Sequence, residues 1–322
     1  MKMTKFAKFA WGVLFYNILV ILWGAYVRAT GSGAGCGSHW PSCNGEIIPR
    51  APQIETIIEF THRMMSGLSL VLIVILLVWA FKAYPKGNIV RKGAVLTIVF
   101  IITEALLGAG LVLFEWVAHD ASVGRALAMT VHLANTFFLL ASITLTAWWA
   151  SGGSRPEMRG NRSIVLLLVI GWIGLLILGM SGALTALGDT LFPVTSLEQG
   201  LTQDFSSTTH YLIRLRLLHP TIAIIVALYL ILLASYLRTA RAGDDVRRFS
   251  LALTLVFIIQ LVAGFINVFL LAPVWLQIIH LLLADLSWIS LVLLSAVTLT
   301  GAKVHTQTSD LKNVEFASAS QD

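Results

Sequence analysis

Long apolar segments separated by short polar ones run through the whole chain of 322 residues. A run of roughly 20 apolar residues is long enough to cross a bilayer as a helix. Such runs predict eight spans, at about 9–29, 64–84, 93–114, 126–150, 163–186, 215–237, 249–271 and 275–300. The chain is 57% hydrophobic and 12% charged, whereas soluble domains carry about 25% charged residues. The pattern therefore predicts an all-α integral membrane protein with eight transmembrane helices.

Lysine and arginine concentrate on one side of these spans. Of the 22 basic residues, 16 lie at the N-terminus, in the connections at 82–92, 155–162 and 238–248, and in the tail. Cytoplasmic loops carry the excess of basic residues, so we expect a multi-pass protein of the plasma membrane with both termini in the cytoplasm. Residues 303–322 are expected to form a short cytoplasmic tail. The net charge of +6 then reflects topology, and nucleic acid is not an expected partner.

The second half of the chain repeats features of the first half at similar spacing. The corresponding positions are Gly24 and Gly179, Thr30 and Thr185, His62 and His219, Glu104 and Gln260, and Gly108 and Gly264. Because four spans return the chain to its starting side, both copies share one orientation. We predict two tandem, pseudo-symmetric four-helix bundles, an N-terminal one at 1–150 and a C-terminal one at 163–302.

Four histidines lie near the outer ends of even-numbered spans, two in each predicted bundle. They are His62, His132, His219 and His280. An imidazole inside a membrane is costly unless it is paired or ligated, and facing helices of a bundle are a common scaffold for cofactors. A haem held by two histidines in each bundle is the simplest occupant. Zinc is a weaker alternative because two histidines leave its coordination incomplete, and hydrogen bonding between helices is the structural alternative.

Charged neighbours make the two histidine pairs unequal. Glu59 lies three residues before His62, so both side chains share one face of a helix, whereas Arg216 occupies the corresponding place in the second half. Glu59 is a candidate for proton handling or for stabilising positive charge; an acid favoured by the helix dipole is the alternative. Arg214 and Arg216 are candidate partners of haem propionates. Arg28 either does the same or extends to the membrane surface.

The outer, extracellular loop at 30–63 contains both cysteines of the chain, Cys36 and Cys43. A structural disulfide in an oxidising compartment is one interpretation. A redox-active pair near His62 is a second, and a metal site that includes His39 is a third. The sequence pattern leaves these alternatives open.

Two further acids lie within the predicted spans, Glu104 and Asp285. Ionisable residues inside a membrane are candidates for function. Each of the two is expected either to serve a proton path or to form a hydrogen bond between helices.

The chain resembles the haem A synthases, membrane enzymes that convert haem O to haem A. The resemblance extends over essentially the whole chain and is greatest to the group with a cysteine pair in the first outer loop. It rests on Gly24-Ala-Tyr-Val-Arg28-Ala-Thr-Gly-Ser-Gly33, on Cys36 and Cys43 around Trp40-Pro41, on Glu59-Phe-Thr-His62-Arg63, on His132-Leu-Ala-Asn135, on His219-Pro220 and on His280 with Asp285. The stretch Gly37-Ser38-His39 departs from the pattern expected before the tryptophan.

The resemblance implies a division of labour between the bundles. Haem A synthases oxidise a methyl group of haem O to a formyl group by successive hydroxylations, and haem A then serves terminal oxidases. By resemblance, His219 and His280 would bind a resident haem b as cofactor. His62 and His132 would hold the substrate haem O.

Other roles follow from the same resemblance. Glu59 would be the catalytic acid, and Cys36 and Cys43 would form a disulfide. The candidate propionate contacts are Arg28, Arg63, Arg214 and Arg216. The implied partners are haem O, membrane lipid, a membrane electron acceptor and the haem O synthase.

Three rival functions belong to other classes. A non-catalytic di-haem b electron carrier would share the four histidines without needing Glu59. A transporter would need interrupted helices near the middle of the membrane. A prenyltransferase that makes haem O would need aspartate-rich motifs, and the chain contains no Asp-x-x-x-Asp cluster. The di-haem carrier is the strongest of the three.

Overall fold

The computed structural model describes residues 3–158, 161–241 and 243–300. Within this part of the chain, eight helices are long and apolar enough to cross a membrane, which confirms the predicted all-α protein with eight spans. They are α1 (Lys5–Ala29), α2 (Ile54–Ala83), α3 (Ile89–Leu113), α4 (Val123–Ala150), α5 (Arg162–Leu191), α8 (Leu218–Ala240) with the short α7 (Tyr211–Leu215) before it, α9 (Asp244–Phe269) and α10 (Val274–Thr298). The expected tail at 303–322 lies outside the described residues, as do residues 301 and 302.

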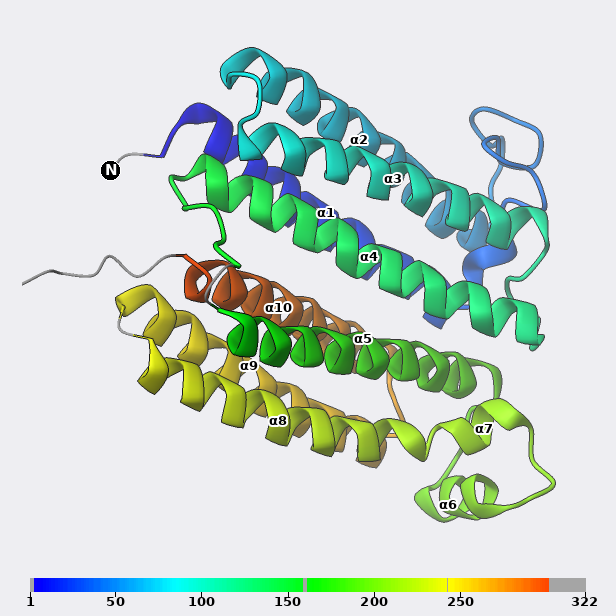
Figure 1. Cartoon of the computed structure of the whole chain (residues 1–322). Coiled ribbons are helices and arrows are strands. Elements are labelled where there is room, and N and C mark those ends of the chain that lie inside the picture. The colour runs from blue at the N-terminus through cyan, green and yellow to red at the C-terminus, as the bar shows by residue number, and fades with distance from the viewer. Residues whose placement is uncertain (1–2, 159–160, 242, 301–322) are drawn as a thin grey trace, which may run out of the picture.

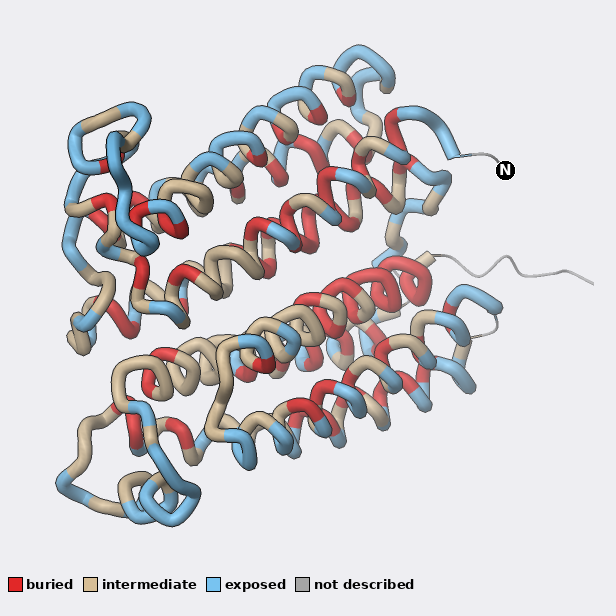
Figure 2. The backbone as a smooth tube through the Cα atoms, turned by 180° about the vertical axis from the view of Figure 1, so that it is seen from behind, coloured by how far each residue is buried: buried red, intermediate tan, exposed pale blue. Residues whose placement is uncertain are grey.

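The spans pack as two bundles of four helices (Figure 1). Helices α1 to α4 form the first bundle, and α5, α8, α9 and α10 form the second. Helices α1 and α4 of the first bundle contact α5 and α10 of the second. Exposed residues follow the outer faces of both bundles (Figure 2), and many of them are large and apolar, among them Val71, Leu96, Leu232 and Ile259. These faces suit contact with acyl chains.

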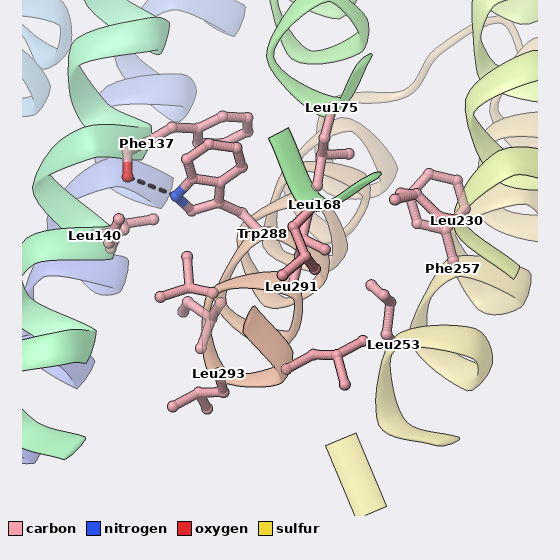
Figure 3. Packing of buried hydrophobic residues seen from close by; sticks show 14 of the residues in the cluster. Phe137, Leu140, Leu168, Leu175, Leu230, Leu253, Phe257, Trp288, Leu291 and Leu293 are labelled. Atoms are coloured by element: carbon pink, nitrogen blue, oxygen red, sulfur yellow. Dashed lines mark hydrogen bonds between the residues drawn. The ribbon is translucent and has the colours of Figure 1, made fainter. Parts of the chain in front are cut away.

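Aromatic packing joins the two bundles near the centre of the molecule (Figure 3). The Trp288 side chain of α10 is fully buried and stacks on Phe137 of α4, with ring centroids 4.8 Å apart. Its indole Nε1 donates a hydrogen bond of 2.6 Å to the Phe137 carbonyl. Trp172 of α5 meets the same indole edge-on at 5.1 Å. The buried indole N–H is thus paired, as burial of a polar group requires.

Some helices extend beyond the predicted apolar runs. Helix α2 begins at Ile54 and α5 continues to Leu191, so the outer loop predicted at 30–63 ends earlier, and Glu59 and His62 belong to a helix. The additional turns carry polar residues such as Thr56 and Asp189. A search for purely apolar runs therefore stops before the helix does.

A short helix, α6 (Leu197–Phe205), lies in the long connection between α5 and α7, where the sequence pattern predicted no helix. Ser196 caps it, because its hydroxyl accepts a hydrogen bond of 3.1 Å from the Gln199 N–H. Its apolar residues recur every four positions, as Leu197, Leu201 and Phe205, and all three are exposed. The helix is far shorter than a membrane span, so a pattern of long apolar runs does not predict it.

Candidate functional site

The four histidines lie near one end of the two bundles. His62 and His132 occupy the third turns of α2 and α4, while His219 and His280 occupy the first turn of α8 and the second turn of α10. Each side chain is partly buried. The structure thus brings the predicted residues together as one pair in each bundle.

Each imidazole lies against a glycine of the preceding span. The pairs are Gly24 with His62, Gly108 with His132, Gly182 with His219, and Gly264 with His280. A Cβ atom added at Gly24 or Gly264 would lie 2.9 Å from the imidazole Cε1, closer than real Cβ contacts, and one at Gly182 would lie 3.0 Å away, tighter than most. Gly24 and Gly264 therefore require glycine for the ring to keep its place, and Gly182 leaves little room for a larger residue.

This packing corrects one match between the two halves. The counterpart of Gly24 is Gly182, because each lies against the first histidine of its bundle. Gly179, which sequence spacing matched to Gly24, lies instead at the contact between bundles, where an added Cβ would be 2.7 Å from Phe137. The match rested on one glycine and one threonine, Thr30 with Thr185, which is too little in a glycine-rich segment to fix the alignment of the two halves.

In the second bundle the two imidazoles face each other across a short gap. The ring centroids of His219 and His280 are 6.3 Å apart, and the rings are inclined by 80°. An imidazole nitrogen binds a metal ion at about 2.0–2.1 Å, which places the centroids of two opposed axial rings roughly 6 Å apart. The spacing therefore fits two ligands of one iron.

The polar partners of these rings are uncharged. His219 Nδ1 lies 3.0 Å from the Ser181 hydroxyl, and His280 Nε2 lies 3.3 Å from the Gln260 amide nitrogen. The other nitrogen of His280, Nδ1, is buried with no hydrogen-bond partner among the described residues. A buried nitrogen without a partner is what a missing ligand leaves behind, so these residues fit a haem.

In the first bundle one imidazole has a charged partner. Nδ1 of His132 lies 3.1 Å from Oε1 of Glu104. That is the distance of an ion pair, although the N–H is not aligned as in a directed hydrogen bond. Nδ1 of His62 is buried without a partner among the described residues. The first pair therefore also fits a haem, in a more polar setting.

Each bundle supplies two histidines, and the rest of the coordination must come from elsewhere. Among the residues that the structure describes, no three His, Cys, Asp or Glu side chains gather as they would around a metal ion. A porphyrin supplies four nitrogen ligands of its own and leaves two axial positions for histidine. That chemistry matches the donor set of each bundle.

Glu59 is buried and already paired. Its Oε1 lies 2.6 Å from Nη2 of Arg63, and its Oε2 accepts a hydrogen bond of 2.8 Å from the Cys36 N–H. Arg63 also donates to the carbonyls of His39 and Ser42, at 2.6 and 2.5 Å. The Glu59–Arg63 pair thus attaches the outer loop to α2, a role that sequence reasoning did not anticipate for either residue.

Cys36 and Cys43 form a disulfide within that loop, and both are fully buried. The loop backbone presses against the start of α2, because a Cβ at Gly35 would lie 2.4 Å from the backbone carbon of Glu55. The Gly35 carbonyl accepts a hydrogen bond of 2.7 Å from the Thr56 hydroxyl. The disulfide therefore sits directly beside the helix that carries Glu59.

The four candidate propionate contacts lie in different surroundings. Arg28 donates to the Ala186 carbonyl and the Thr190 hydroxyl of α5, both at 2.6 Å, and to Gln277 of α10 at 2.9 Å. It therefore links the first bundle to the second. Arg63 is paired with Glu59 as described above, and Arg214 is exposed.

Arg216 is buried and lies 3.0 Å from both Asp189 and Asp204. Sequence reasoning missed these two acids, although they lie in or next to the long connection that precedes Arg216. Asp204 belongs to α6, outside the spans, and burial raises the pKa of its carboxyl while the nearby Arg216 opposes that shift. The ion pairs tie the outer connection to the second bundle.

Asp285 is completely buried in α10. Neither of its carboxylate oxygens has a hydrogen-bond partner among the described residues. The bond between helices that was one expectation for this acid is thus not formed by those residues.

The comparison with known families covers most of the chain. The family of cytochrome oxidase assembly proteins named COX15-CtaA matches residues 7–292. All four histidines and Glu59 fall within this range.

Individual relatives carry two names. A protoheme IX farnesyltransferase of Thermus thermophilus is 53% identical over 301 residues, which are 93% of this chain and 50% of the relative. A heme A synthase of Halalkalibacterium halodurans is 38% identical over 141 residues, 44% of each chain. Another, of Alkalihalophilus pseudofirmus, is 47% identical over 97 residues, 30% of this chain and 33% of the relative. The chain thus spans about half the length of these relatives or less. The family match over residues 7–292 and the two histidine pairs agree, and the chain belongs to the COX15-CtaA family, the haem A synthase family.

Proposed function

We propose that this protein is a haem A synthase, an oxidoreductase that converts a methyl group of haem O to a formyl group through two hydroxylations and loss of water. One observation carries the proposal. Two histidine pairs fit haem in similar bundles, but among the described residues a carboxylate partner is found for a histidine of the first pair alone, Glu104 at 3.1 Å from His132. The buried Glu59 also lies one helical turn from His62. If both haem sites only carried electrons, the first pair would not need carboxylates that the second pair lacks in the described part of the chain.

The two sites would have different occupants. His219 and His280, with the neutral partners Ser181 and Gln260, would hold a resident haem b. His62 and His132 would hold haem O. The haem irons supply the redox chemistry, while the protein positions the rings through the histidines and their glycine neighbours.

Glu59 is the proposed catalytic acid of the first site. It is 4% exposed and lies one helical turn from His62. Arg63 balances its charge at 2.6 Å, so the carboxylate can stay buried near the substrate pocket. There it would handle a proton or stabilise positive charge that develops on the substrate.

The proposed setting is the plasma membrane, with both termini in the cytoplasm and the histidines towards the outer face. A membrane electron acceptor would take up the electrons released by the oxidation. The haem O synthase is a proposed partner, because a Thermus protein named protoheme IX farnesyltransferase resembles this chain over half of its own length. This chain itself has no Asp-x-x-x-Asp cluster, so we assign the prenyl transfer to a partner.

Supplying haem O to the purified full-length protein tests the function. We expect haem A or a hydroxylated intermediate to appear when the pigments are extracted and separated by chromatography. The alternative, a di-haem b electron carrier, predicts two equivalents of haem b and no product even with haem O present. That result would overturn the proposal.

A further inference from the structure

The bundles differ at the residues around the histidines of α4 and α10. In the first bundle, the carboxylate of Glu104 lies 3.1 Å from His132 Nδ1. In the second, the amide of Gln260 lies 3.3 Å from His280 Nε2. Equivalent places in the repeat thus hold a charged partner in one bundle and a neutral one in the other.

The Glu104 carboxylate is fixed by a network of its own. Asn135 donates to its Oε2 and Thr136 to its Oε1, each at 2.5 Å. Asn135 is held in turn, because its amide also donates to the Phe100 carbonyl at 2.9 Å and its Oδ1 accepts from Thr103 at 2.6 Å. The side chain of Glu104 is only 17% exposed. The acid therefore has little freedom to turn away from the imidazole.

Among the described residues, this network is found in the first bundle alone. The spacing that relates His132 to His280 places Leu283 and Ala284 where the first bundle has Asn135 and Thr136. Neither side chain can donate a hydrogen bond. The acid and both of its donors are thus replaced together, which indicates that the three residues work as a unit.

We propose that Glu104 is the positioning residue of His132. It holds the ring from Nδ1, so that Nε2 is the nitrogen presented to the haem of the first bundle. This inference rests on the proposed function, in which His132 binds the substrate haem. A carboxylate bound to the second nitrogen of a ligand histidine fixes the ring and strengthens it as a donor.

An electronic asymmetry between the sites follows. A stronger donor with a nearby negative charge stabilises oxidised iron, so the first haem is easier to oxidise than the second. The amide and hydroxyl partners of His280 and His219 exert no comparable effect. Electron flow from the first bundle to the second is then favoured.

The variants Glu104→Gln and Gln260→Glu exchange the two partners and serve as matched tests. The full-length protein is loaded with haem b and haem O, and each haem is followed by optical redox titration and by the electron paramagnetic resonance of its oxidised iron. We expect Glu104→Gln to shift the midpoint potential of the first haem upward and to weaken its retention about 10- to 100-fold. Gln260→Glu should lower the potential of the second haem.

A double variant keeps the test valid if Glu104→Gln fails to fold. Asn135→Leu with Thr136→Ala gives the first bundle the residues of the second and releases the Glu104 carboxylate without removing it. The midpoint potential of the first haem should again shift upward. Retention of haem b in the second bundle reports folding. Unchanged potential and retention of the first haem in folded variants would overturn the role of Glu104 and leave the proposed function standing. Absence of haem bound by His62 and His132 in the parent protein would overturn both.

Discussion

Glu59 combines deep burial with two strong contacts, to Arg63 and to the Cys36 N–H. Glu59→Gln keeps the shape of the side chain but removes the negative charge that the proposed chemistry needs. We expect haem to remain bound while haem A formation stalls, as measured by pigment chromatography. Glu55→Gln, one turn earlier on α2 and exposed, is the matched control. An unchanged yield of haem A in Glu59→Gln would remove the catalytic role.

Gly264 offers a test of the haem pocket that leaves every ligand in place. A Cβ at this position would lie 2.9 Å from His280 Cε1, so Gly264→Ala should displace the ring and reduce the haem b content. At Gly174 the added Cβ would lie 3.5 Å from Val226, an ordinary contact, and alanine favours helix by up to about 1 kcal/mol over glycine. Gly174→Ala should therefore retain haem. Equal haem contents in the two variants would contradict the packing role of Gly264.

The four histidines could be found from the sequence, because imidazoles are rare within apolar runs and these recur in both halves. Their immediate partners could not. Ser181 of α5 contacts His219 of α8, and Asn135 of α4 contacts Glu104, the partner of His132. Which helix face meets a polar side chain of a neighbouring helix depends on helix rotation and packing. The hydrogen bonds of Asn135 and Thr136 to Glu104 depend on the packing of α4 against α3, which the sequence pattern does not give.

The outer disulfide loop is an element that depends on a close backbone contact. Gly35→Ala places a Cβ 2.4 Å from the backbone of α2, whereas a Cβ at Gly33 would meet Val117 at 3.4 Å. We expect Gly35→Ala to detach the loop and to speed hydrogen exchange at the Cys36 amide, which Glu59 otherwise protects. Gly33→Ala should behave like the parent protein. Slow exchange at Cys36 in both variants would show that the loop does not depend on this contact.

Element boundaries were predictable where apolar runs coincide with helices. The eight spans follow from such runs, but α2 begins at Ile54, before the apolar run at 64–84. Helix α6 was missed because it is short and amphipathic. In α2, the polar residues Thr56 and Glu59 that precede the apolar run contact the outer loop.

At the scale of the whole molecule, Trp288 holds the two bundles together. Trp288→Ala removes the stack on Phe137 and the hydrogen bond to its carbonyl. We expect a loss of about 3–5 kcal/mol in the free energy of unfolding, as for other large buried aromatic residues. Denaturant titration in detergent measures it, with the 57% exposed Trp275 as the control position. Similar, small losses for both tryptophans would show that the contact between bundles contributes little.

The repeat predicts two bundles of four helices, but it does not predict which residues join them. Arg28 was expected at a propionate or the membrane surface, yet it binds α5 and α10 across the interface. Sequence periodicity shows which residues face inward, but does not show which bundle they face.

The division of labour between the bundles is tested most directly by counting the haems of single histidine variants. Full-length His62→Ala, His132→Ala, His219→Ala and His280→Ala are purified in the presence of haem O, and their pigments are separated by chromatography. We predict that the first two lose haem O and its oxidised products but keep haem b, and that the last two lose haem b. Loss of haem b from His62→Ala or His132→Ala, with haem O retained, would contradict the assignment of substrate to the first bundle.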